Sequence, residues 1–214
     1  MQKVVVFLDY ANLSCSEKAQ RIRIDQEHLL KEYLSLNSEG RFLQAAYAYV
    51  PLDPRKEHAS DSVIEGLWTS GYVVKSKKGA ISGHSYKCNF DVDIAMDVMK
   101  SVYEIKPDIV TIISGDFDFV PLVLRLREMG IYVEVASFRN SMSKQLASRS
   151  SGYICLDNYF EEFYSSDLSS DNAMQELDIT DDTPLEATAD VTESDMLDYF
   201  ENEEDEEDEG EGEE

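Results

Sequence analysis

The chain has 214 residues and a net charge of −25, and this charge is unevenly distributed. Residues 165–214 contain 22 of the 44 acidic residues and no Lys or Arg, whereas residues 1–164 contain 22 acids against all 19 bases. Residues 1–164 lie in the usual length range of one domain and can bury a hydrophobic core. Residues 165–214 have too few apolar residues to fold alone, so we expect a disordered acidic tail.

The sequence predicts no association with membranes. No apolar run reaches the length of a membrane-spanning helix, and Met1 leads directly into a predicted strand rather than into a cleavable leader. Cys15, Cys88 and Cys155 are widely spaced and form no zinc-binding pattern, so we expect reduced thiols. These features predict a cytoplasmic protein and leave its oligomeric state open.

Within residues 1–164, short β-branched runs alternate with segments of helical periodicity, which is typical of a parallel sheet covered by helices. We expect strands at residues 3–8, 42–50, 72–75, 109–113, 131–136 and 153–156. We expect helices at residues 25–36, 55–70, 90–105, 117–129, 141–147 and 158–164. Gly71 and Gly130 follow helical runs, where a left-handed residue ends a helix. The predicted fold class is therefore α/β, with a doubly wound, mainly parallel sheet and helices on both faces.

Two acids follow strands that this topology brings together. The commonest doubly wound order places the first and fourth strands side by side, at the point where the strand order reverses. Asp9 ends the first strand and Asp116 follows the fourth. Side chains at the carboxyl ends of these strands converge, so we expect Asp9 and Asp116 to be neighbours.

The helix expected at residues 90–105 supplies a third acid. Its apolar stripe includes Ile94, Val98 and Val102, and Asp91 lies in line with that stripe at the first turn. A charge that points into the fold is costly unless something offsets it. Asp93 falls on the solvent face, and Asp97 lies off the stripe and more than a turn away.

A divalent cation would offset these charges. Carboxylates that are forced together raise one another's pKa, whereas a bound cation favours their ionised forms. Asp9, Asp91 and Asp116 therefore form a candidate site for Mg²⁺ or Mn²⁺. Asp118, which lies just ahead of Pro121, is either a further ligand or a helix N-cap.

Three motifs of the chain, in the same order, resemble those of a known family. FLDYANL, KCNFDVDIAMD and SGDFDFVPLVLRLREMGIYVEVASF resemble the motifs of NYN domains, which belong to the PIN-like nuclease superfamily and include the LabA-like proteins. The resemblance covers about residues 1–160. It departs from the family at Cys88, where a Gly is common, and at Ser150 and Ser151, where an acid is common.

The resemblance implies a PIN-like, Rossmannoid fold and metal-dependent cleavage of RNA. It also implies that five acids and one amide occupy the acidic site, namely Asp9, Asp91, Asp97, Asp116, Asp118 and Asn12. We assign Asp9, Asp91, Asp116 and Asp118 as catalytic acids, and Asn12 and Ser114 as hydrogen-bonding positioners. No His, Ser or Cys lies in a pattern typical of general-base or covalent catalysis, so a metal-activated water is the expected nucleophile.

Basic residues at the same edge of the sheet are candidate contacts for RNA phosphates. They comprise Lys75, Lys77, Lys78, His84 and Lys87 before the Asp91 helix, and Arg139, Lys144 and Arg149 after the fifth strand. The run from Lys75 to Gly79 could equally be an exposed turn. Tyr72 and Tyr86 could stack on unpaired bases, which predicts a single-stranded substrate.

Two other functions fit the sequence less well. A catalytically silent PIN-like scaffold could recruit RNA or protein through the tail. A Toprim or haloacid-dehalogenase-like domain is a second alternative, but the latter needs an acid two residues after Asp9, where Ala11 stands.

The tail has three possible roles. It could be a solubilising spacer, or it could bind a protein partner through the short apolar segment at residues 196–200. It could also mimic nucleic acid and cover the basic residues, which would slow cleavage.

Overall fold

The computed structural model describes residues 1–34, 40–56, 58–82 and 85–164. The predictions for the acidic tail, for His84 and for the end of the helix at residues 25–36 lie outside these ranges.

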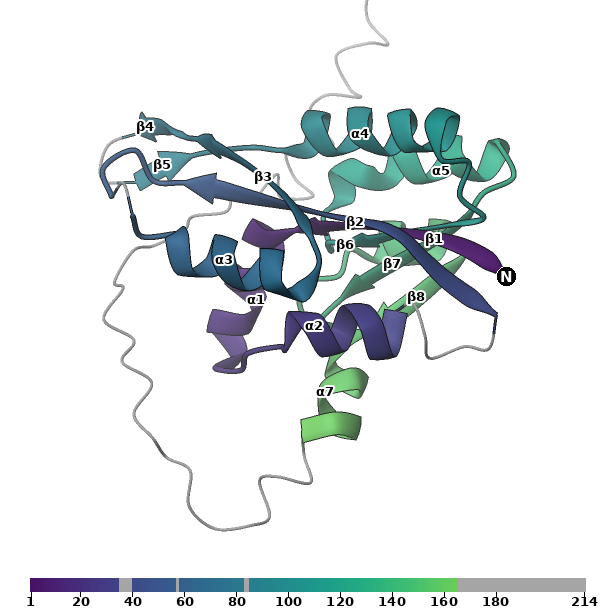
Figure 1. Cartoon of the computed structure of the whole chain (residues 1–214), viewed down its shortest axis with the longest axis horizontal. Coiled ribbons are helices and arrows are strands. Elements are labelled where there is room, and N and C mark those ends of the chain that lie inside the picture. The colour runs from purple at the N-terminus through teal and green to yellow at the C-terminus, as the bar shows by residue number, and fades with distance from the viewer. Residues whose placement is uncertain (35–39, 57, 83–84, 165–214) are drawn as a thin grey trace, which may run out of the picture.

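The centre of the fold is a parallel six-stranded sheet with the order β3-β2-β1-β6-β7-β8 (Figure 1). Its strands are β1 (Gln2–Asp9), β2 (Arg41–Leu52), β3 (Val73–Lys78), β6 (Ile109–Ile113), β7 (Tyr132–Ser137) and β8 (Gly152–Cys155). The strands β1 and β6, first and fourth in the sheet by sequence, pair with each other, with Leu8 opposite Ile113. This is the doubly wound order that the sequence predicted, and it confirms the α/β fold class.

Helices cover both faces of the sheet, so that it lies between two cores (Figure 1). The elements are α1 (Tyr10–Gln20), α2 (Gln26–His28) with the π-helical η1 (Leu29–Leu34), α3 (Asp61–Ser70), α4 (Asp91–Glu104), the 3₁₀ turn η2 (Phe117–Phe119), α5 (Val120–Glu128), α6 (Lys144–Arg149) and α7 (Leu156–Tyr164). Gly71 and Gly130 have positive φ of 102° and 79° just after α3 and α5, as predicted.

The strand β1 shows how the sequence builds both cores. Val4, Val6 and Leu8 pack in the core beneath α1, α2 and α3, whereas Val5 and Phe7 pack in the core beneath α4 and α5. Successive side chains of a strand point to opposite faces, so an uninterrupted apolar run fills both layers. The same alternation directs Asp9 towards the face that carries α4 and α5.

The sequence did not predict helix α1. Its buried residues are Leu13, Ser14, Ser16 and Glu17, so polar side chains occupy the face that periodicity expects to be apolar. The buried Glu17 carboxylate accepts the N–H of Ile24 at 2.7 Å. This bond joins α1 to the segment that precedes α2.

Around β3 the structure differs from the predicted boundaries. The stretch from Lys75 to Lys78 is strand rather than an exposed turn, and a two-stranded hairpin follows, formed by β4 (Ala80–Ser82) and β5 (Ser85–Lys87). Helix α3 begins at Asp61 rather than at residue 55. Strands of three residues are too short for alternation to reveal them.

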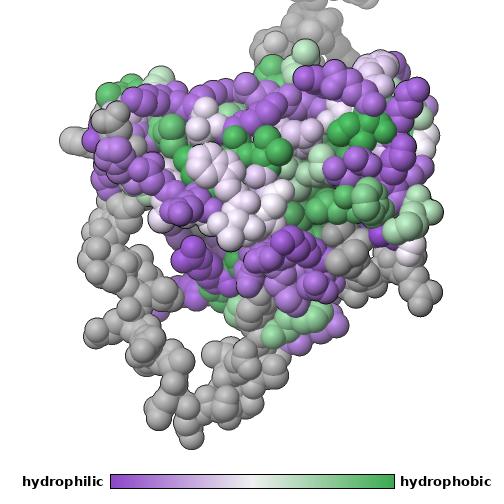
Figure 2. Space-filling model, viewed as in Figure 1, coloured by the Kyte–Doolittle hydropathy of each residue, from purple (hydrophilic) through white to green (hydrophobic). Residues whose placement is uncertain are grey.

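The surface seen in Figure 2 is mainly hydrophilic, with smaller hydrophobic patches between the hydrophilic areas. Exposed large apolar residues include Trp68 on α3 and Val73 on β3. Single exposed apolar side chains are ordinary on folded proteins. Within the described ranges, no helix has both the length and the apolar character needed to cross a bilayer.

Candidate metal centre

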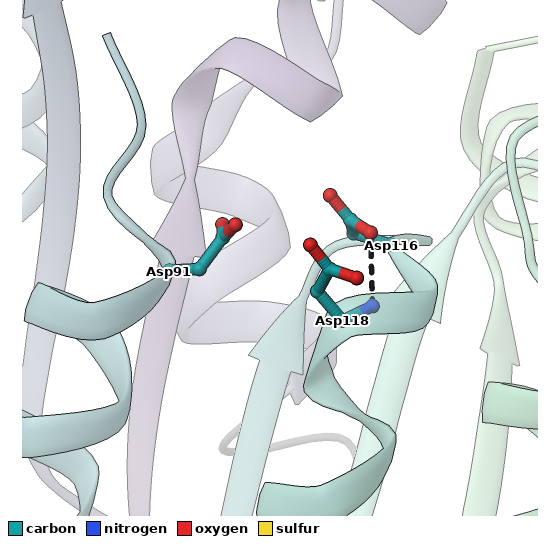
Figure 3. Close-up of side chains that lie close together, drawn as sticks. All are labelled: Asp91, Asp116 and Asp118. Carbon is teal, nitrogen blue, oxygen red and sulfur yellow. Dashed lines mark hydrogen bonds between the residues drawn. The ribbon is translucent and has the colours of Figure 1, made fainter. Parts of the chain in front are cut away.

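Three carboxylates gather at the carboxyl edge of the sheet. Asp91, Asp116 and Asp118 each offer an oxygen within 4.8 Å of the others, and Figure 3 shows their side chains facing a common space. Asp91 is the first residue of α4, while Asp116 and Asp118 lie in the turn that follows β6. Asp91 and Asp116, 25 positions apart in the sequence, thus lie together at this edge of the sheet.

Asp116 and Asp118 are oriented by a local capping interaction. Asp116 is the N-cap of η2, and its Oδ1 accepts the backbone N–H of Asp118 at 3.0 Å (Figure 3). The N-cap of this turn is therefore Asp116, and the capping role considered as the alternative for Asp118 is wrong. The Asp118 carboxylate is exposed and remains in the acidic cluster.

Asp9 lies beside this cluster but outside the 4.8 Å group. It caps α1, because one carboxylate oxygen accepts the backbone N–H of Asn12 at 3.3 Å. The other oxygen accepts the hydroxyl of Ser114 at 3.2 Å. Asp9 is only 8 % exposed, and this burial, together with the negative charges of Asp91 and Asp116, raises its pKa. Asp9 therefore interacts electrostatically with Asp91 and Asp116, although the 4.8 Å group consists of Asp91, Asp116 and Asp118.

Asn12 and Ser114 connect the β1–α1 turn to the β6–η2 turn. The side-chain oxygen of Asn12 accepts the backbone N–H of Gly115 at 3.0 Å. The Ser114 hydroxyl donates to Asp9 and accepts the N–H of Asp116 at 3.2 Å. These bonds fix Asp9 relative to Asp116, which agrees with the positioning role predicted for Asn12 and Ser114.

Gly115 is required at this junction by close packing. A Cβ at Gly115 would lie 1.9 Å from the carbonyl oxygen of Ser141 and 2.8 Å from the hydroxyl of Ser137. The carbonyl of Gly115 also accepts the N–H of Ser143 at 2.9 Å. The segment before α6 therefore packs directly against the turn that carries Asp116.

Burial makes the acids hold their protons more tightly. Burial raises the pKa of Asp9 to about 6, and the nearby carboxylates of Asp91 and Asp116 add to this effect. Burial also raises the pKa of Asp91, to which Asp116 and Asp118 contribute, and the pKa of Asp116, to which Asp118 contributes. Carboxylate oxygens are the ligands that divalent cations such as Mg²⁺ or Mn²⁺ prefer, and a bound cation favours the ionised forms of clustered acids. These residues therefore fit such an ion.

Asp97 is not part of the cluster. Its carboxylate accepts hydrogen bonds from Lys75 at 2.5 Å and from the Tyr49 hydroxyl at 2.6 Å. Burial opposes ionisation of Asp97, but these two bonds and the Lys75 charge lower its pKa overall. The contact with Tyr49 could not be predicted from the sequence, because Tyr49 and Asp97 lie 48 positions apart. Asp97 is already neutralised by Lys75, unlike the three clustered acids.

The predicted phosphate contacts fall into two groups. Lys75 is paired with Asp97, and Lys77 is paired with Asp93 and lies over the Phe90 ring. Arg139 also has a partner, the side chain of Asn158. The remaining lysines are exposed at the carboxyl edge, namely Lys78 at the end of β3, Lys87 at the end of β5 and Lys144 at the start of α6. Arg149 is exposed too, but its guanidinium donates to Gln145, and the adjoining Ser151 pairs with Val133 at the start of β7, so Arg149 lies away from this edge.

The two tyrosines considered for base stacking have different environments. Tyr72 is only 3 % exposed and belongs to the core beneath α1, α2 and α3, so its predicted stacking on RNA was wrong. Tyr86 is also largely buried, but it lines a cavity that Tyr10, the residue after Asp9, lines as well.

The comparisons with known proteins agree with this geometry. The model of the NYN domain family matches residues 3–157. A crystal structure of a protein of unknown function from Vibrio parahaemolyticus RIMD 2210633 is similar, with a TM-score of 0.61 and 22 % identity, over 73 % of this chain and 94 % of that one. At this identity the likeness concerns the fold alone.

Two further comparisons add no functional information. A structure of MurG from Acinetobacter baumannii covers 72 % of this chain and 45 % of its own, with 13 % identity, but its TM-score of 0.30 is too low to support an argument. No curated protein matches the chain.

Proposed function

The chain belongs to the NYN domain family, a family of PIN-like nuclease domains, and from this membership and its acidic cluster we propose that it is a metal-dependent ribonuclease. The reaction would be hydrolysis of RNA phosphodiester bonds. The observation that carries the proposal is the meeting of Asp91, Asp116 and Asp118 within 4.8 Å, beside the buried Asp9.

In this proposal the acids have different roles according to their positions. Asp91, Asp116 and Asp118 would hold Mg²⁺ or Mn²⁺, and Asp9 would complete the negative site from its buried position. The ion would activate water and neutralise charge on the phosphoryl oxygens. Asn12 and Ser114 would keep Asp9 and Asp116 aligned through the hydrogen bonds that join their turns. Asp97 is a less favoured ligand, because its carboxylate already accepts hydrogen bonds from Lys75 and Tyr49.

The substrate would be single-stranded RNA held by basic residues on both sides of the acids. Lys78 and Lys87 are exposed on one side, and Lys144 on the other, which supports phosphate contacts at both ends of the scissile segment. Lys75, Lys77 and Arg139 could contact RNA only by sharing or leaving their present partners.

The finer features of the proposal are supported by sequence. The three motifs support a LabA-like member of the family, and the composition supports a cytoplasmic protein. We further propose a nuclease domain at residues 1–164, since the family match ends at residue 157 and α7 ends at Tyr164, and an acidic tail at residues 165–214 that has a regulatory role or a protein partner.

Cleavage of an end-labelled single-stranded RNA tests the proposal. We expect cleavage with Mg²⁺ or Mn²⁺, none with EDTA, and a loss of at least about 100-fold in Asp116→Asn, because an acid that aligns the ion acts mainly in the transition state. Asp93→Asn is the matched control, since Asp93 is an exposed acid of α4 outside the cluster. An Asp116→Asn variant that is folded and fully active would overturn the proposal.

A further inference from the structure

A cavity of about 210 Å³ is lined by Tyr10, the residue that follows Asp9. It is lined by residues of α1, of the segment that ends β2 and leads into α3, and of β5. Tyr10 and Lys18 come from α1, Asp53 and Lys56 from the segment after β2, and Tyr86 from β5. None of these residues was assigned to the acidic site, and the cavity has no role in the mechanism described so far.

The cavity is connected to the acids through the chain. Tyr10 directly follows Asp9, and Tyr86 precedes Asp91 by five positions. In the pairing of β1 with β2, Asp9 lies opposite Tyr49, so Asp53 extends past Asp9 at the same carboxyl edge. A strand that leaves the acids on the β2 side would therefore reach this cavity, whereas one that leaves on the β7 side would reach Lys144.

The groups around the cavity suit one unpaired nucleotide. Lys18 and Lys56 are exposed cations, the groups that contact phosphates. Tyr10 and Tyr86 offer aromatic surface, on which bases of unpaired strands stack. Asp53 is 6 % exposed, and Arg55 binds it through two bonds of 2.9 and 2.7 Å. This pairing holds the pKa of Asp53 below its usual range, and Arg55 offsets the charge of the carboxylate.

The size of the cavity limits what can enter it. Pockets that enclose drug-sized ligands have volumes of about 300–1,000 Å³. A cavity of about 210 Å³ is smaller and fits a single base or part of a nucleotide. A paired base is held in its helix and cannot enter such a cavity unless it leaves the duplex.

We propose that this cavity binds one unpaired nucleotide of the RNA strand beside the scissile bond. Lys18, together with Lys56, contacts its phosphate, and the Tyr10 and Tyr86 rings contact its base. The proposal rests on the nuclease function proposed above. It also specifies the path of the RNA on one side of the scissile bond, where the strand would lie between α1 and α3.

Salt dependence of binding tests the phosphate contact. The full-length Asp116→Asn protein, in which turnover should be lost, is titrated with a single-stranded RNA at several salt concentrations. Loss of one phosphate contact lowers the slope of log K against log salt by about 0.7 for a single strand. We expect this change for Lys18→Ala. The matched control is Lys3→Ala, which removes the same charge from an exposed position at the start of β1, and here we expect no change.

Photocrosslinking tests the base contact without altering the cavity. An RNA that carries 5-iodouridine should crosslink to Tyr86 or Tyr10, as mapped by mass spectrometry. The proposal is overturned if crosslinks fall only on residues outside the cavity, or if Lys18→Ala and Lys3→Ala have the same salt slope while the unmodified protein binds and cleaves RNA. If the unmodified protein neither binds nor cleaves RNA, the proposed nuclease function itself fails.

Discussion

Replacing Asp9 by Asn should stabilise the metal-free protein at neutral pH. Asp9 is almost completely buried and caps α1 while accepting the Ser114 hydroxyl. An Asn side chain has nearly the same size. It can still accept the N–H of Asn12 and can donate its own N–H to Ser114. The variant therefore removes the buried charge and retains the packing and the cap.

The size of the effect follows from the pKa of Asp9. The ordinary value is 3.8, and burial raises it to about 6 in the folded protein. Each pKa unit corresponds to about 1.36 kcal/mol, so the ionised carboxylate costs the folded state up to about 3 kcal/mol. Between pH 3.8 and about 6 the folded protein binds more protons than the unfolded chain, so the free energy of unfolding falls as pH rises. The cost is absent below this window and complete above it.

Chemical denaturation in EDTA, followed by circular dichroism, measures this difference. Above pH 6 we expect Asp9→Asn to be more stable than the unmodified protein by up to about 3 kcal/mol, and below pH 3.8 we expect the two to be alike. With excess Mg²⁺ the order should reverse, because the variant loses an acid that favours the cation. A stability difference that does not change with pH would refute this account of Asp9.

Three further changes test other parts of the account. Gly115→Ala should lower the free energy of unfolding by about 2 kcal/mol or more, because the new Cβ would lie 1.9 Å from the Ser141 carbonyl. Gly66→Ala, a helical position with open space around it, should instead raise that free energy by about 0.5–1 kcal/mol, and equal effects in denaturation would contradict the packing argument. Asp97→Asn should retain most of the RNA cleavage, since Asp97 lies outside the cluster, and loss of cleavage comparable with that of Asp116→Asn would make Asp97 a ligand. Deletion of residues 165–214 should raise the cleavage rate most at low salt if the tail covers the basic residues, and rates that are unchanged at every ionic strength would exclude that role.

The sequence predicted the elements whose apolar residues follow a clear pattern. The strands β1 and β6 each contain an apolar run, and α4 has a stripe that includes Ile94 and Val98, so their positions and the strand order could be inferred. Topology then predicted that Asp9 and Asp116 lie at one edge, and the apolar stripe of the α4 helix predicted that Asp91 points into the fold. This part of the site depends on backbone arrangement, which hydrophobic patterning largely determines.

The parts that were missed depend on contacts between side chains. Helix α1 buries Ser14, Ser16 and Glu17, so it has no apolar stripe to reveal it. The pairing of Lys75 with Asp97 joins residues 22 positions apart. Charged residues near a predicted site look equally available in a sequence, and only the folded structure distinguishes those with partners from those without.

A crystal of the full-length protein soaked in Mn²⁺ tests the central claim most directly. We expect anomalous density for an ion about 2.0–2.6 Å from oxygens of Asp91 and Asp116, with Asp118 or a water that it binds completing the shell. Three separated carboxylates with no ion between them, at Mn²⁺ concentrations well above those of a cell, would contradict the claim that these acids form a metal centre.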